Sequence, residues 1–316
     1  MDEIDPRAIP RILRIEGLLP FTGCAILLGC VVTIREAGIA GADWGLFAIA
    51  AVAALLIHID GHIWNDIMDI EIDRREKSKE TRRDRPLVFG WATIAEYRRI
   101  SLAVTAAVVV LAAFLTTRRV FTPLLFIAGF FFDYAYNHPR LALAHKPWTE
   151  WYLFPWLVVG VTVTVVYAAT GTFSPLALIL SLLLGLTATC FVVSMMRRDA
   201  VSDRLGGKRT SSVAYPAFPH STFYGIVTLA AAVLAFRPLA GVLGNPDLAY
   251  GIVLVTVTCA AATTILGAGV DQLVARVRYS AFPDFERKAN NLMLVQVGIS
   301  IVYALGISAL VLAGGR

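Results

Sequence analysis

Long apolar segments separated by short polar ones repeat along the whole chain. A transmembrane helix needs about 20 mostly apolar residues, and segments of about that length recur. The pattern predicts nine spans, of which the fourth and seventh are short, at 17–37, 44–64, 98–117, 120–137, 151–171, 175–196, 221–236, 248–271 and 291–313. No long polar stretch interrupts them, so we expect an all-α polytopic membrane protein with a single membrane-embedded domain, 1–316.

Composition and charge support this interpretation. The chain is 57% hydrophobic and 16% charged, whereas soluble domains carry about 25% charged residues. With nine spans and a cytoplasmic N-terminus, 23 Lys and Arg residues fall on the cytoplasmic side and 5 on the other. This bias follows the positive-inside rule. The net charge of +5 therefore reflects membrane topology, and we expect no nucleic-acid partner.

A polar stripe runs down the second span into the segment NDIMDIEID at 65–73. Its acids are spaced three and four residues apart, so they share one face of a helix. The stripe consists of His58, His62, Asn65, Asp66, Asp69 and Asp73. Ionisable groups at membrane depth are costly and usually face a functional cavity.

A second acidic cluster closes the sixth span in the segment MMRRDAVSDRLGGKRT at 195–210. Asp199 and Asp203 are four residues apart, and we predict that they also share one helical face. The second and sixth spans run in the same direction, so both clusters lie on the cytoplasmic side and can face one cavity. The surrounding basic residues are Arg198, Arg204, Lys208 and Arg209.

The combination of acids and bases points to a metal and a phosphate. Carboxylate and amide oxygens suit Mg²⁺, which keeps waters and shares itself with phosphate oxygens. The nearby Arg and Lys side chains suit a phosphate ligand. The alternative is that the acids only pair with neighbouring arginines in solvated loops, but two clusters at matched helix ends favour the metal site.

These residues resemble the UbiA-type intramembrane prenyltransferase family. Its first motif, NDxxDxxxD, corresponds to 65–73, and its second, DxxxD with a following glycine and basic-Thr ending, to 199–210. An RP-hydrophobic-x-x-G signature matches 85–90, a Tyr-x-x-Pro element matches 136–139, and the start of the first span matches at Arg14. Two positions depart from the family: Arg140 replaces a second proline, and Gly17 replaces a basic residue.

The resemblance implies nine helices around a central cavity, with a cytoplasmic cap formed by 74–85 and 204–220. It implies Mg²⁺-dependent prenyl transfer from an isoprenyl diphosphate to a lipophilic or aromatic acceptor, with two ions. The metal-binding and catalytic candidates are Asn65, Asp66, Asp69, Asp73, Asp199 and Asp203. The candidates for diphosphate binding are Arg85, Arg198, Lys208, Arg209, Lys146, Arg74, Arg82 and Arg140. The candidates for the prenyl and acceptor pocket are His58, His62, Tyr136, Tyr134, Asp133 and Arg14.

The sequence leaves several alternatives open. His58 and His62 either orient the acceptor or are hydrogen-bonded core residues. Asp60 points away from the stripe, and we expect it to have a structural partner. Rival functions are a terpene cyclase, a transferase using phosphoribosyl diphosphate, and a secondary transporter. The acceptor, prenyl length, pathway and oligomeric state do not follow from the sequence, and no obligate protein partner is evident.

Overall fold

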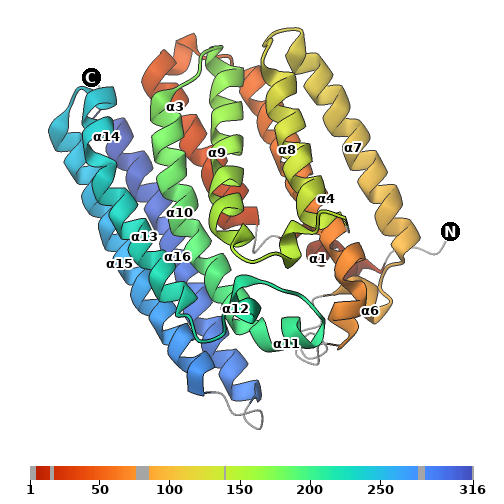
Figure 1. The fold of residues 1–316 in the computed structure, drawn as a ribbon. Helices are drawn as coiled ribbons and strands as arrows, with labels where there is room; N and C mark the ends of the chain where they lie inside the picture. Colours follow the sequence, from red (N-terminus) through yellow and green to blue (C-terminus); the bar gives the residue numbers. More distant parts are fainter. Residues whose placement is uncertain (1–4, 15–17, 76–84, 139, 277–281, 315–316) are drawn as a thin grey trace.

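The structure, a computed structural model, describes residues 5–14, 18–75, 85–138, 140–276 and 282–314. Long helices run side by side, and several short ones lie at one end of the bundle, the bottom in Figure 1. The long helices are α3 (Cys24–Gly41), α4 (Trp44–Arg75), α7 (Ile94–Thr116), α8 (Thr122–Asn137), α9 (Thr149–Thr170), α10 (Pro175–Arg198), α13 (His220–Leu234), α15 (Pro246–Arg276) and α16 (Phe282–Ala313).

Short elements connect and cap this bundle. They are η1 (Pro6–Ala8), α1 (Ile9–Leu13), η2 (Leu19–Gly23), α6 (Pro86–Phe89), η3 (Leu143–His145), α11 (Ala200–Leu205), α12 (Ser211–Ala214) and α14 (Phe236–Leu243). Figure 1 places α1, α6, α11 and α12 together at the lower end of the bundle. The described residues contain no strand, so the predicted all-α membrane class is confirmed.

The predicted count of nine spans is not confirmed. Eight helical segments of the described chain are long and apolar enough to cross a membrane. Helix α8, the predicted fourth span, has only 16 residues. The predicted seventh span is longer than 221–236, because α13 and α14 together form one segment, His220–Leu243. The protein is an integral, multi-pass membrane protein.

The main core lies between α3, α9, α10, α15 and α16. Leu28, Leu180, Leu184 and Ile252 have no exposed surface there. Small residues allow close helix contacts in membranes. A Cβ built on Gly185 of α10 would lie 2.7 Å from the Pro155 carbonyl oxygen of α9, so a side chain there would force these two helices apart.

Helix α4 continues well beyond the predicted end at 64 and carries the whole first motif on one unbroken helix. Ile63, Ile67 and Ile70 form a buried stripe along its lower half and belong to the cluster that contains Leu87 and Tyr97. The isoleucines and the aspartates lie on different sides of the same turns. The apolar side of α4 packs against the cluster with Leu87 and Tyr97, and the acidic side faces the short elements at this end of the bundle.

Candidate active site

Three aspartates lie on one face at the lower end of α4. Asp66, Asp69 and Asp73 are only 4%, 3% and 2% exposed. Burying a carboxylate is costly unless a charged partner or a metal compensates it. Their partners therefore define the chemistry of this region.

Arg85 links the first and last of these aspartates. Its Nη1 atom donates a hydrogen bond to Asp66 Oδ1 at 2.9 Å, and its Nε atom lies 3.0 Å from Asp73 Oδ2. Arg14, directly after α1, also pairs with Asp66 Oδ1. The hydroxyl of Tyr97 donates to Asp66 Oδ2 at 3.4 Å. Segments far apart in sequence thus converge on one carboxylate.

The two acidic motifs meet at the amine of Lys208. Its Nζ atom lies 2.6 Å from Asp69 Oδ2 and 3.9 Å from Asp203 Oδ1. His145 Nε2 lies 3.2 Å from Asp69 Oδ1, and Asn65 donates to Asp69 Oδ2 at 3.2 Å. The structure thus brings Asp69 of the first motif and Asp203 of the second to the same amine.

The second motif spans the junction between two helices. Helix α10 ends at Arg198, Asp199 is its C-cap, and Asp203 belongs to α11. A helical turn nevertheless survives, because the Asp203 amide donates to the Asp199 carbonyl at 2.8 Å. Arg198 holds the Asp199 carboxylate through two bonds of 2.5 and 2.7 Å and also donates to Asn290 of α16, so the chain turns where this side chain is anchored.

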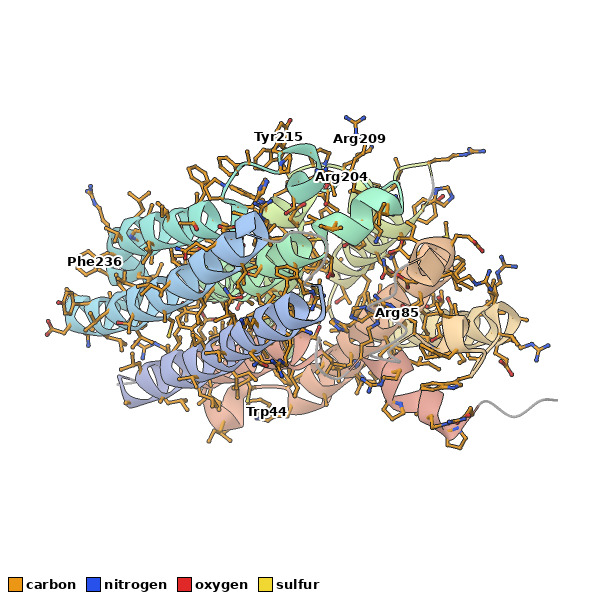
Figure 2. All side chains as sticks on the ribbon, turned by 90° about the horizontal axis from the view of Figure 1, so that it is seen from below. Trp44, Arg85, Arg204, Arg209, Tyr215 and Phe236 are labelled. Carbon is orange, nitrogen blue, oxygen red and sulfur yellow. The ribbon has the colours of Figure 1, made fainter. Side chains whose placement is uncertain are left out.

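The remaining predicted diphosphate-binding bases lie away from these carboxylates or outside the described residues. Arg140, Lys146 and Arg209 are exposed, and Arg74 pairs with the exposed Glu71. In Figure 2 the Arg209 side chain extends away from the helices, whereas Arg85 lies among them. Arg82 and most of the predicted 74–85 cap segment fall outside the described residues.

The predicted pocket histidines form a chain along α4. His58 Nδ1 lies 2.9 Å from the Thr22 hydroxyl, and His62 Nε2 lies 3.1 Å from His58 Nε2. Tyr136 of α8 packs edge-on against Phe154 of α9, with ring centroids 5.8 Å apart. These contacts place polar nitrogen atoms and aromatic rings within the bundle.

The structure does not bring Asp133 and Tyr134 together with the aspartates of the first motif. Asp133 accepts a hydrogen bond from Asn137 at 2.8 Å. Asp133 and Asn137 line a separate pocket together with Tyr134 and Trp64. Tyr134 is 54% exposed, so it contributes to an outer surface of the bundle.

Sequence reasoning missed three residues of the site. His145 contacts Asp69, although its neighbour Lys146 was the predicted base. Tyr97 and Asn290 contact Asp66 and Arg198 from distant helices. The Tyr-x-x-Pro element marks the segment before His145, but only folding shows which of two adjacent basic residues points inward.

The donor chemistry fits Mg²⁺. Within the described part of the chain, no three His, Cys, Asp or Glu groups lie close enough to hold one ion, because the aspartates are paired with bases as the side chains stand. Mg²⁺ commonly takes one or two carboxylates and completes its shell with waters and phosphate oxygens. The oxygen donors of α4 and α11 meet that requirement when a diphosphate supplies the remaining oxygens.

Comparisons with known proteins agree with this architecture. A UbiA homologue from Archaeoglobus fulgidus, solved bound to GPP and Mg²⁺, is similar over 94% of this chain and 99% of its own, with 14% identity and a TM-score of 0.60. A UbiA homologue from Aeropyrum pernix shows 18% identity over 91% and 96%, with a TM-score of 0.58. A structure reported for digeranylgeranylglyceryl phosphate synthase shows 16% identity over 95% and 99%, with a TM-score of 0.55.

The sequence itself gives the family. No curated protein sequence matches the chain significantly, and the structural similarities establish the fold. The model of the UbiA prenyltransferase family, however, matches residues 26–280, a region that contains both aspartate motifs and most of the membrane helices. The chain therefore belongs to the UbiA prenyltransferase family.

Proposed function

We propose that the protein transfers a prenyl group from an isoprenyl diphosphate to a lipophilic or aromatic acceptor within the membrane, with Mg²⁺. The observation that carries this proposal is the position of Lys208, whose amine lies within 4 Å of carboxylates from both motifs. A diphosphate is the ligand that needs acids to hold its metal and bases to hold its oxygens. Family membership and the homologue bound to GPP and Mg²⁺ support the same chemistry.

The acids of both motifs would hold the metal. Two ions are expected, with ligands drawn from Asn65, Asp66, Asp69, Asp73, Asp199 and Asp203. When bound, Mg²⁺ supplies positive charge beside the departing diphosphate. In the apo arrangement, Arg14, Arg85 and Lys208 neutralise the same carboxylates. These bases are therefore already positioned to pair with diphosphate oxygens once metal occupies the acids.

The reaction follows from charge separation. Breaking the allylic C–O bond leaves the electron pair on the diphosphate and a cation on the prenyl carbon. A nucleophilic atom of the acceptor then bonds to that carbon and releases a proton. Arg85 and Lys208 stabilise the leaving anion, and the aromatic faces of Tyr136 and Phe154 stabilise the cation by about 0.5–2 kcal/mol each.

The proposed orientation places the acids at the cytoplasmic face. The 23-to-5 division of Lys and Arg residues puts the ends of α4 and α10 on that side. Helix α12, within the predicted 204–220 cap segment, and α11, which ends at the start of that segment, lie at the same end of the bundle (Figure 1). We propose that the chain forms one membrane-embedded domain with this segment covering the site.

Turnover of a labelled prenyl diphosphate with a panel of acceptors, analysed by mass spectrometry, tests the proposal. Asp66→Ala and Asp199→Ala are expected to leave an inserted, folded and inactive protein, and EDTA is expected to stop the wild type. Glu71→Ala is the matched control, because Glu71 lies on the same helix but is exposed, and it should keep full activity.

Three outcomes would contradict the proposal. Full turnover by either aspartate variant, or full turnover in EDTA, would show that the acids do not act through a metal. A hydrocarbon product formed without any acceptor would assign cyclisation instead of transfer. Substrate uptake into proteoliposomes without diphosphate release would assign transport.

A further inference from the structure

A second pocket lies between α4 and α8, away from the metal-binding acids. Its volume is about 270 Å³, and it is lined by Trp64 and Met68 of α4 and by residues of α8 and its C-terminal end. Trp64 and Met68 are four residues apart and share one face of α4. Asp66, Asp69 and Asp73 occupy a different face, so α4 separates this pocket from the candidate active site.

One side of the pocket carries a carboxylate that no cation compensates. Asp133 accepts a hydrogen bond from the Asn137 amide and forms no salt bridge with the described residues. His138, whose ring stacks on that of Tyr134, also lines the pocket. Gly61 makes room for Asp133, because a Cβ there would lie 2.8 Å from Oδ1 and 3.8 Å from Oδ2.

A second observation independently points to a missing donor. Asn137 also lines the pocket and is only 8% exposed. Its Nδ2 atom donates to Asp133 and to the Gly61 carbonyl, but its Oδ1 atom is buried without a hydrogen-bond partner. Leaving a buried acceptor without a hydrogen bond destabilises the fold. A ligand that brings hydrogen-bond donors would remove this cost.

The other walls of the pocket are aromatic. Phe130, Tyr134 and Trp64 line it, and the last two are 54% and 38% exposed. The pocket therefore opens on the outer surface of the bundle, where Trp and Tyr commonly mark the membrane interface. Aromatic faces attract cations, and their apolar edges accommodate an alkyl or aryl body.

We propose that this pocket binds a protonated amine carried on an apolar body. An ammonium group offers several donors, no acceptor and one positive charge, which matches the open Asn137 Oδ1 acceptor, the carboxylate of Asp133 and the aromatic walls. An alcohol offers one donor and no charge, and a phosphate brings a charge of the wrong sign. The amine is either the headgroup of an aminophospholipid or a free lipophilic amine, and this binding does not depend on the proposed prenyl transfer.

The test uses full-length protein labelled with 5-fluorotryptophan and observed by ¹⁹F NMR. The protein contains six tryptophans, and the signal lost in Trp64→Phe identifies Trp64. Octylamine, titrated at a pH where it is protonated, should shift that signal saturably and bind at least about tenfold more tightly than octanol. The signal of Trp156, which is also partly exposed but lies on α9, should not move and serves as the control.

Asp133→Asn keeps the size of the side chain and removes its charge. In this variant, the preference for octylamine over octanol should disappear, while the thermal unfolding transition is retained. Asp66→Asn should keep the preference, which separates this pocket from the active site. Equal binding of octylamine and octanol by the wild type, or an unchanged preference in Asp133→Asn, would overturn the proposal.

Nanodiscs distinguish the two sources of the amine. If phosphatidylethanolamine added to phosphatidylcholine discs shifts the Trp64 signal, the headgroup is the ligand. If only octylamine shifts it, the ligand is a free lipophilic amine. If neither shifts it, no amine binds and the proposal is wrong.

Discussion

Acids lie on or against two sides of α4, and their partners differ in kind. On one side, Asp66, Asp69 and Asp73 pair with Arg14, Arg85 and Lys208, and these bases come from three other segments of the chain. On the other side, the partners are neutral. Asp60 accepts a hydrogen bond from the Thr105 hydroxyl at 3.2 Å, and Asp133 of α8 accepts one from Asn137.

This difference suggests two uses for acids in one membrane domain. A carboxylate paired with Lys and Arg side chains can exchange those cations for a metal while the bases pair with an anionic substrate. A carboxylate with only neutral partners can still bind a positively charged ligand. Charge compensation therefore separates the proposed diphosphate site from the proposed amine site, although both lie against one helix.

The largest expected effect comes from removing a charge on the metal-binding side. Asp69→Asn keeps the shape of the side chain but removes a ligand shared with Lys208, and turnover should fall by about 100-fold or more. Asp60→Asn removes an acid from the opposite side of the same helix and should stay within about twofold of the wild type. Steady-state assays with a saturating acceptor measure both, and equal losses would erase the distinction between the two sides.

Substituting Lys208 should impair the reaction less than substituting the acids that it contacts. Lys208→Met keeps the apolar stem and removes the charge, so the KM for the prenyl diphosphate should rise by about tenfold. Arg209→Met is the matched control, because Arg209 is adjacent but exposed, and its KM should change little. If Arg209→Met raised the KM more than Lys208→Met, the exposed base would be the one that binds diphosphate.

A smaller effect is expected at His145. His145→Gln weakens the hydrogen bond to Asp69, which is worth about 1 kcal/mol or about a fivefold change in kcat/KM. Lys146→Gln alters the adjacent, exposed position and should leave kcat/KM unchanged. Comparing the two kcat/KM values tests whether the inward residue of this pair is the histidine, and the reverse order of effects would show that it is the lysine.

The smallest effect is expected at Gly61, beside the proposed amine site. Gly61→Ala would place a Cβ 2.8 Å from Asp133 Oδ1, so the free energy of unfolding in mixed micelles should fall by about 1 kcal/mol. Gly160→Ala on α9 is the control, because no atom lies within 4 Å of its added Cβ, and stability should be kept or slightly raised. A stable Gly61→Ala variant would mean that Asp133 does not need this space.

The sequence predicts the class of fold well because long apolar segments leave little alternative to transmembrane helices. Spacing alone also places Asp66, Asp69 and Asp73 on one face of a helix, since helical periodicity is local. The count of nine spans is not confirmed at α8, because 16 residues are near the lower limit for crossing a bilayer and composition does not decide such a case.

Contacts between distant segments are harder to predict. The pairing of Asp66 with Arg14 and of Asp69 with Lys208 depends on tertiary packing, as does the choice between His145 and Lys146. The turn at Asp199 was missed because its cause lies in side-chain contacts of Arg198 with Asp199 and with Asn290 of α16. Asp133 was predicted for the acceptor pocket because it lies one turn from Tyr136, but it lines the pocket between α4 and α8, whereas Tyr136 packs against Phe154 of α9.

The central claim is that both aspartate motifs bind one diphosphate, and a double-mutant cycle tests it most directly. Calorimetry can measure binding of a non-reactive prenyl thiolodiphosphate in Mg²⁺ to the wild type, Asp69→Asn, Asp203→Asn and the double variant. A shared site predicts that the two losses are non-additive by about 1 kcal/mol or more. Additive losses would show that the two motifs act independently and would contradict the account.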